Sequence, residues 1–174
     1  MNLTLKIVFS LVIIFCGGYL GMIASSALSI RINQIEELSI AINQIGFNIG
    51  FLKMPVFEAI SSVAKSRHGA VARFLGNISE EMSEFGFSPA DAFEKAIEKS
   101  AGELCISEND TLILREFAEN LGKGGVEYEM NNINAVSAKL KIAKDEAEGE
   151  KNQKYKLWRG AGILIGIFIV IMLF

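Results

Sequence analysis

The segment ENLGKGGVEYEM, Glu119 to Met130, decides between two fold classes. Its glycines are Gly122, Gly124 and Gly125. With Lys123 between them, they look like the opening of a phosphate-binding loop, the mark of a nucleotide-hydrolysing α/β enzyme. Such a loop follows a buried strand and continues with a lysine and a hydroxyl residue, whereas this segment follows an amphipathic helical pattern and continues with Glu127 and Glu129. We therefore reject the phosphate loop and predict a helix-turn-helix corner in an all-α protein.

The two helices that meet at this corner carry clear signals. Ser107 is placed to cap the first helix, with Asp110 three residues on as its partner in a capping box. Gly122 is expected to end that helix, because glycine adopts the left-handed conformation without strain. The predicted buried faces are Leu112, Ile113, Phe117 and Leu121 before the corner, and Val126, Met130, Ile133, Val136 and Leu140 after it.

Two more helices are marked just before this pair. Ser88 and Pro89 begin one of them, and Asp91 is positioned for a second capping box. The segment AVARFLGNISEEMSEF, residues 70–85, carries apolar residues on one helical face and is expected to end at Gly86.

The remaining helices precede residue 70. Pro55 suits the first turn of a helix that we expect to end near Arg67. Before it, apolar residues spaced by three and four from Ile32 to Leu52 form a coiled-coil-like seam. Gly46 and Gly50 interrupt this seam, which indicates close packing at those two positions. The sequence therefore predicts a helical bundle of about five to six helices.

Both ends of the chain are apolar. Ile7 to Ile30 is 24 residues without a charge, about 36 Å of helix, which exceeds the roughly 30 Å hydrocarbon core of a bilayer. A second run, residues 160–174, is extended by Leu157 and Trp158. The alternative for the first run is a cleaved signal peptide, but the apolar core of such a peptide spans only about 7–15 residues. We favour a retained anchor.

We predict four segments: an N-terminal transmembrane helix (1–30), a cytoplasmic helical bundle (31–143), a charged helical stalk (144–156) and a C-terminal transmembrane helix (157–174). The stalk is expected to be solvated all round. The positive-inside rule places the middle segment in the cytoplasm, because Arg31 and the Lys and Arg residues from Lys141 to Arg159 lie on its side of the two spans and only Lys6 lies on the other side. The expected interfacial anchors are Lys6, Arg31, Trp158 and Arg159.

Small residues recur every four positions in both apolar runs. They are Gly17, Gly21, Ser25 and Ser29 in the first run, and Gly162 and Gly166 in the second. Small side chains let helix backbones approach closely in lipid. We therefore predict transmembrane helix packing through these residues and a homo-oligomer.

Residues with catalytic chemistry do not gather in the sequence. His68 is the single histidine, and Cys105 has no base nearby, so neither a metal site nor a thiol nucleophile is expected. We interpret Cys105 as a packing residue, and Glu80, Glu81 and Glu84 as a solvated helix face. The net charge of −3, without a dense basic patch, argues against nucleic acid. The sequence predicts no enzyme activity and no cofactor.

In order and spacing, these features resemble the stage III sporulation protein AB family of spore-forming bacteria. The likeness covers nearly the whole chain and rests on RINQIEELSIAINQI (31–45), SPADAFEKAI (88–97), LILREFAENLG (112–122), KLWRGAGILIGIFIVIMLF (156–174), the glycine-containing first run and the charged final helix. One departure lies at the corner, where the family often has Asp and Gln and this chain has Gly125 and Glu129.

The resemblance implies a domain similar to the cytoplasmic domains of the type II secretion inner-membrane platform protein. It also implies a non-enzymatic scaffold role in the mother-cell channel complex that supports the engulfed forespore. Implied partners are a secretion-type ATPase, stage III sporulation protein AA, and the other channel proteins. Candidate surfaces for the ATPase are the basic stretch Lys65 to Arg73 and the acidic stretch Glu80 to Glu84.

Two other classes of function stay open. One is a two-span membrane sensor with an extracytoplasmic ligand-binding helical domain, which the positive charges beside the second span disfavour. The other is a membrane enzyme, which the lack of a nucleophile–base pair disfavours.

Overall fold

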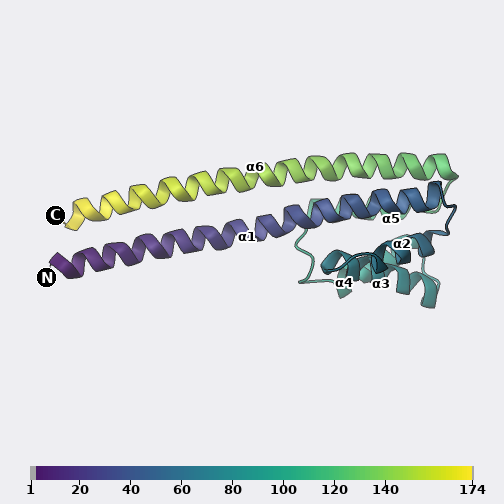
Figure 1. The fold of residues 1–174 in the computed structure, drawn as a ribbon, viewed down its shortest axis with the longest axis horizontal. Coiled ribbons are helices and arrows are strands. Elements are labelled where there is room, and N and C mark those ends of the chain that lie inside the picture. The colour runs from purple at the N-terminus through teal and green to yellow at the C-terminus, as the bar shows by residue number, and fades with distance from the viewer. Residues whose placement is uncertain (1–2, 174) are drawn as a thin grey trace. The chain divides into compact units, whose positions relative to one another are not determined.

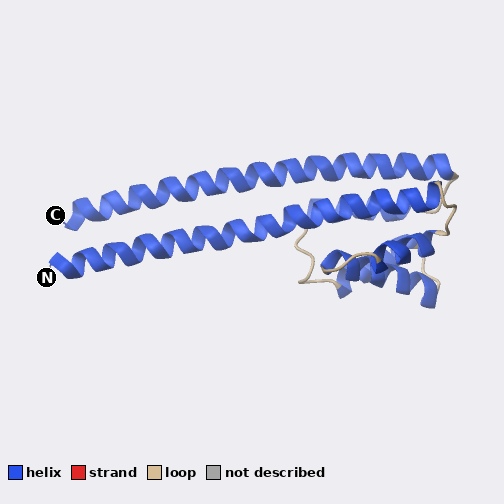
Figure 2. Ribbon diagram, viewed as in Figure 1, coloured by secondary structure: helices blue, strands red, loops and turns tan. Residues whose placement is uncertain are grey.

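The computed structural model describes the backbone of residues 3–173 and the side chains of residues 26–157. Its helices are α1 (Leu3–Gly50), α2 (Val56–Lys65), α3 (Ala70–Phe85), α4 (Pro89–Lys99), α5 (Glu108–Asn120) and α6 (Val126–Leu173) (Figure 1). No strand occurs within residues 3–173 (Figure 2). The all-α prediction is therefore confirmed, with six helices over this range.

Contacts along the chain divide it into two units. Arg31–Asp145 forms one unit, called here the bundle, and the residues on either side of it form the other. Among the residues whose side chains are described, no helix contains a stretch long and apolar enough to cross a membrane. The predicted transmembrane helices, 1–30 and 157–174, have most of their side chains outside the described range, so they stay predictions.

Capping side chains fix the starts of two helices in the bundle. At α5, the Asp110 backbone N–H donates to Ser107 Oγ at 3.2 Å, and the Ser107 N–H donates to Asp110 Oδ2 at 2.8 Å, which completes the predicted capping box. At α4, Pro89 is the first helical residue, and Ser88 accepts the Asp91 N–H. The Ser88 hydroxyl, and not its backbone N–H, donates to the Asp91 carboxylate at 2.7 Å. Only half of that second box is formed.

Glycines end two helices in the expected way. Gly86 follows α3 with φ of 67°, and Gly122 follows α5 with φ of 80°, both in the left-handed region. The helix expected to end near Arg67 is shorter than predicted. It begins after Pro55, whose ψ of 149° is extended, and its last helical residue is Lys65.

The core of the bundle collects one face from every helix. Phe74 of α3 and Phe93 of α4 meet edge to face, with ring centroids 5.6 Å apart. The buried residues at the centre of this core include Ile35, Leu38, Ile42 and Ile45 of α1, Ile60 and Val63 of α2, Phe74 and Leu75 of α3, Phe93 of α4, Leu114 and Phe117 of α5, and Ile133, Val136 and Leu140 of α6. Removal of this much apolar surface from water is the main force holding the bundle together.

Within the bundle, α1 packs closely against α6 at the two glycines of the α1 seam. A methyl group added to Gly46 would lie 2.6 Å from Cδ1 of Ile133, and one added to Gly50 would lie 3.1 Å from Sδ of Met130. A hydrogen bond from the Ser137 hydroxyl to Asn43 Oδ1, at 3.2 Å, joins the same two helices. The close packing predicted at these glycines is confirmed.

Four predictions about buried faces were wrong. Leu52, Leu112 and Val126 are exposed, and Leu114 is buried where Leu112 was expected. Leu52 follows the last residue of α1, Gly50, so the helical spacing no longer applies to it. The predicted stalk, 144–156, is not solvated all round, because Ala147 of α6 is fully buried.

Candidate interaction surface

The glycine corner is closed by its own glutamate. Oε1 of the buried Glu129 accepts the N–H of Gly122 at 2.9 Å and that of Gly124 at 3.4 Å. A carboxylate oxygen thus occupies the place where these two amides could hold a phosphate. The other oxygen, Oε2, is buried and has no hydrogen-bond partner. Sequence reasoning missed this role, because it considered Glu127 and Glu129 only as charges that would repel a nucleotide.

A second polar cluster fixes the opposite end of the bundle portion of α1. Arg31 Nε donates to Asp110 Oδ2 at 2.8 Å, while Nη2 donates to Oδ1 at 3.1 Å and to Ser107 Oγ at 3.1 Å. Nearby, Gln34 donates to the Glu103 carbonyl and accepts the Cys105 N–H. These contacts join α1 to the start of α5 and to the loop before it.

Burial alone would raise the pKa of the Asp110 carboxyl. Hydrogen bonds from Arg31 and Ser107, together with the Arg31 charge, outweigh this effect and hold the pKa of Asp110 below its ordinary value. The carboxylate is fully buried and Arg31 is mostly buried. From the sequence, Arg31 was predicted only as a membrane-interface anchor and Asp110 only as a capping residue. Their pairing was missed because the two residues are 79 positions apart and no local pattern links them.

Several charged residues of the two candidate ATPase surfaces form ion pairs or hydrogen bonds with other residues of the bundle. Glu81 is buried and pairs with Lys99 at 2.6 Å, and its hydrogen bond raises the pKa of Lys99. The prediction of a wholly solvated acidic face is therefore wrong at Glu81. On the basic stretch, Arg73 pairs with Glu103 at 2.6 Å and Arg67 donates to a glutamine of α1. Exposed pairs of this kind add little stability.

Most residues of the predicted membrane sites lie outside the described side chains. These are Gly17, Gly21, Ser25, Gly162 and Gly166 of the small-residue pattern, and Lys6, Trp158 and Arg159 of the interfacial anchors. Of the two sets, only Ser29, which is half-buried, and Arg31 have described side chains. Helix packing in the membrane and anchoring at its surface stay predictions.

His68 and Cys105 do not form a metal-binding or catalytic site with other described side chains. His68 is exposed, and no three His, Cys, Asp or Glu residues within the described side chains lie close enough together to hold a metal ion. Cys105 lies in the loop between α4 and α5 with an exposed thiol. Its interpretation as a packing residue was wrong.

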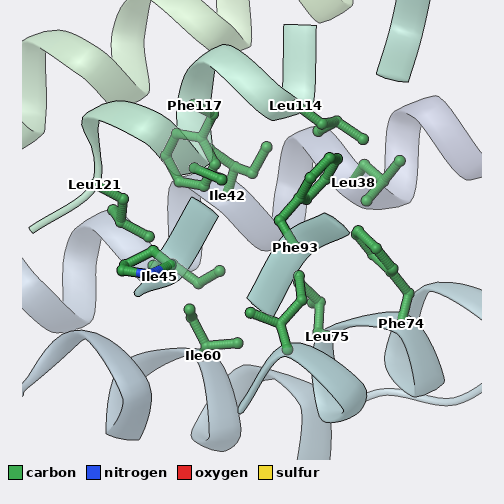
Figure 3. Close-up of a pocket in the computed structure, with 13 residues that line it drawn as sticks. Leu38, Ile42, Ile45, Ile60, Phe74, Leu75, Phe93, Leu114, Phe117 and Leu121 are labelled. Carbon is green, nitrogen blue, oxygen red and sulfur yellow. The ribbon is translucent and has the colours of Figure 1, made fainter. Parts of the chain in front are cut away.

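The bundle contains a small internal cavity and an open groove. One, of about 30 Å³, lies in the core among the apolar side chains shown in Figure 3, which point toward one another from α1 to α5. It has room for about one water molecule and offers no polar partner. The other is an open groove of about 470 Å³ between α1 and α6, lined partly by Ile40 and Ala138. Glu36 and Lys144, which also line it, form an ion pair at 3.0 Å.

The end of the bundle farthest from residue 31 exposes a group of apolar side chains. The loop after α1 and the corner before α6 meet there, since a methyl group on Gly50 would lie 3.8 Å from Val126 Cγ1 (Figure 1). We call this surface the distal tip and define it as Phe47, Phe51, Leu52, Lys53, Lys123 and Val126. It lies about 29 Å along α1 from Arg31, at 1.5 Å per residue.

Together these features define an all-helical bundle protein whose first and last described helices, α1 and α6, are each 48 residues long. The chain belongs to the stage III sporulation protein AB family, whose model matches residues 6–174. It is 21% identical over 169 residues to stage III sporulation protein AB of Bacillus subtilis (strain 168), which covers 97% of this chain and 99% of that protein.

A solved structure of stage III sporulation protein AB (SpoIIIAB) has the same fold, with a TM-score of 0.66 at 21% identity. The match covers 71% of this chain and 98% of the solved one. The family resemblance inferred from the sequence is therefore confirmed. Membership of the family gives the protein a part in the sporulation stage III complex.

Proposed function

We propose that the protein is a two-span membrane scaffold of the sporulation stage III complex, with its bundle in the mother-cell cytoplasm. In this role it couples a secretion-type ATPase to an envelope channel and performs no chemistry itself. The observation that carries the proposal is the family match over residues 6–174, which includes both apolar runs. The proposed segments are 1–30, 31–143, 144–156 and 157–174, as the sequence predicts.

The charge distribution supports the proposed orientation. Lys and Arg cluster from Lys141 to Arg159, beside the second apolar run, and Arg31 follows the first run, while Lys6 is alone on the other side. Loops rich in these residues stay in the cytoplasm. The ATPase proposed as partner is stage III sporulation protein AA, and a bundle on the cytoplasmic side is accessible to it.

The experiment that tests the topology uses Cys105, because its thiol is exposed in the loop between α4 and α5. A Cys16→Ala variant keeps Cys105 as the single thiol. Intact sporulating cells are treated with a membrane-impermeant maleimide, and a second sample is permeabilised first. We expect labelling only after permeabilisation.

Labelling of Cys105 in intact cells would contradict the cytoplasmic placement and the direct contact with an ATPase. It would favour the sensor with an extracytoplasmic domain. A Cys105→Ser variant controls for labelling of other groups, and denatured samples show that the thiol is intact.

A further inference from the structure

The distal tip presents apolar side chains that no described residue covers. The rings of Phe47 and Phe51 stack with centroids 5.2 Å apart and an interplanar angle of 20°. They are 51% and 77% exposed, and Leu52 beside them is 57% exposed. Single exposed apolar residues are ordinary, but a contiguous group of this kind marks a surface that another molecule covers.

Two lysines flank these apolar residues. Lys53 has φ of 55°, a left-handed conformation that is sterically unfavourable for a residue with a side chain. Lys123 is exposed in the glycine corner. Neither lysine has a carboxylate partner among the described side chains. The surface is therefore an apolar centre with cations at its edge, the usual arrangement of a protein interface.

We propose that the distal tip docks a different protein that presents an apolar pocket edged by carboxylates. Phe47 and Phe51 fill the pocket, since buried aromatic side chains carry most of the affinity at interfaces. Lys53 and Lys123 pair with the carboxylates and steer the encounter. The assignment rests on the proposed function, which makes the secretion-type ATPase the first protein to test at this surface.

The charges on α1 make a second copy of the chain a poor occupant. Glu37, Ile40 and Phe47 lie along one exposed face of α1 at spacings of three and seven residues, and Phe51, just past the end of α1, follows Phe47 by four. Two copies anchored in one membrane would stand parallel. A two-fold pairing of these faces would then set Glu37 against Glu37 and Lys53 against Lys53, and like charges placed together oppose association.

A lipid surface fits the tip less well than a protein does. Segments that bind anionic lipid through charge usually carry clusters of about 4–8 basic residues, whereas the tip offers Lys53 and Lys123. The stacked rings of Phe47 and Phe51 also form a defined shape, which suits a pocket better than it suits a fluid bilayer.

The test measures binding of the full-length chain, held in phosphatidylcholine nanodiscs, to purified stage III sporulation protein AA from the same organism. The variants are Phe51→Ser, Phe47→Ala with Phe51→Ala, and Lys53→Glu with Lys123→Glu. Matched controls are Leu112→Ala, another exposed apolar residue at 51%, and Lys141→Glu, an exposed lysine of α6 that lies outside the tip and outside both candidate ATPase stretches. A urea midpoint equal to that of the wild type shows that each variant is folded.

We expect the double phenylalanine variant to bind at least about tenfold more weakly, the size of a typical hot-spot loss. Phe51→Ser alone should lose much of the same affinity. The lysine variant should also bind more weakly and lose part of the salt dependence of the wild type. Leu112→Ala and Lys141→Glu should bind as the wild type does.

Normal binding by both phenylalanine variants would overturn the proposed docking surface and leave the coupling to the ATPase intact. Failure of the wild type to bind would contradict the proposed coupling and this inference with it. If the tip variants lost only their sedimentation with phosphatidylserine-containing vesicles, the partner of the tip would be a lipid surface. If the tip variants lost only the dimer seen in analytical ultracentrifugation, the partner of the tip would be a second copy of the chain. Either result would overturn the assignment to a different protein.

Discussion

At the scale of single residues, the Arg31–Asp110 pair joins two helices that the sequence keeps far apart. Arg31→Met leaves the Asp110 carboxylate buried without its cation, which should lower the free energy of unfolding by about 3 kcal/mol. Arg31→Lys keeps the charge but loses the bidentate contact with Asp110, so it should lower the free energy of unfolding by less than Arg31→Met does. The urea midpoint of the full-length chain in detergent micelles, followed by pulse proteolysis of the bundle, measures both. An unchanged midpoint in Arg31→Met would contradict a stabilising role for the pair.

The same pair predicts how stability changes with pH. The folded-state pKa of Asp110 lies below its ordinary value. The stability that the ionised Asp110 carboxylate contributes is therefore fully present above the unfolded pKa of about 4, and it is lost as pH falls through the folded-state pKa. Asp110→Asn should be less stable than the wild type at pH 7, and the difference should narrow below about pH 4. Urea midpoints of both proteins from pH 7 to pH 3 test this. A constant difference over that range would exclude Asp110 as the titrating group.

Glu129 makes a separate prediction at the glycine corner. Glu129→Gln keeps an oxygen for the Gly122 and Gly124 amides and removes a buried charge, so its stability should equal or exceed that of the wild type. Glu129→Ala removes the acceptor of both amides and should cost about 1–2 kcal/mol. Urea midpoints of the two variants separate these effects. Equal losses in both would show that the charge, and not the acceptor, matters.

At the scale of elements, the contact between α1 and α6 depends on Gly46. An alanine there gains about 1 kcal/mol in helix propensity, but its methyl group would meet Ile133 Cδ1 at 2.6 Å. Overpacking of this kind costs about 1–3 kcal/mol, so Gly46→Ala should destabilise the bundle. In α3, Gly76 has nothing within 4 Å of an added methyl group, and Gly76→Ala should stabilise by up to about 1 kcal/mol.

A double-mutant cycle checks the cause. Ile133→Val removes the Cδ1 atom that the new methyl group would meet, so Gly46→Ala should cost less in that background. The cycle needs the four urea midpoints of the wild type, both single variants and the double variant. If Gly46→Ala and Gly76→Ala changed stability in the same direction, close packing at Gly46 would not be the limiting contact.

The elements themselves were largely predictable from local chemistry. Ser107 with Asp110, Pro89, Gly86 and Gly122 each act within a few residues of the chain, so the signals that they give at helix ends are readable in sequence. The apolar face of α1 was predictable because the spacing of its isoleucines is regular. On α5 the spacing allowed either Leu112 or Leu114, and only packing against the other helices decides for Leu114.

The polar contacts were not predictable in the same way. Arg31 with Asp110, and Glu81 with Lys99, join helices through tertiary structure, and a charged residue in a sequence is most often solvated. Glu129 was missed for another reason. Its partners are backbone amides, which every residue has and which therefore leave no mark on the sequence.

At the scale of the whole molecule, the last prediction concerns self-association through the apolar runs. Gly17, Gly21, Ser25 and Ser29 recur every four positions, and such patterns bring helices together in lipid. We expect Ser25→Cys, in a chain lacking Cys16 and Cys105, to form disulfide-linked dimers when membranes are oxidised. Ile23→Cys is the control, because two residues correspond to about 200° around an ideal helix. Non-reducing gels of membranes at native expression levels measure both.

Dimers at position 25 but not at position 23 would support a homo-oligomer that packs through the small-residue face. Equal crosslinking at both positions would reflect random collision in the membrane. Monomer at both would contradict self-association through this run. The result also bears on the distal tip, because copies held together in the membrane would present several tips side by side. Such an array raises the effective concentration of docking sites for a multivalent partner, even where each contact is weak.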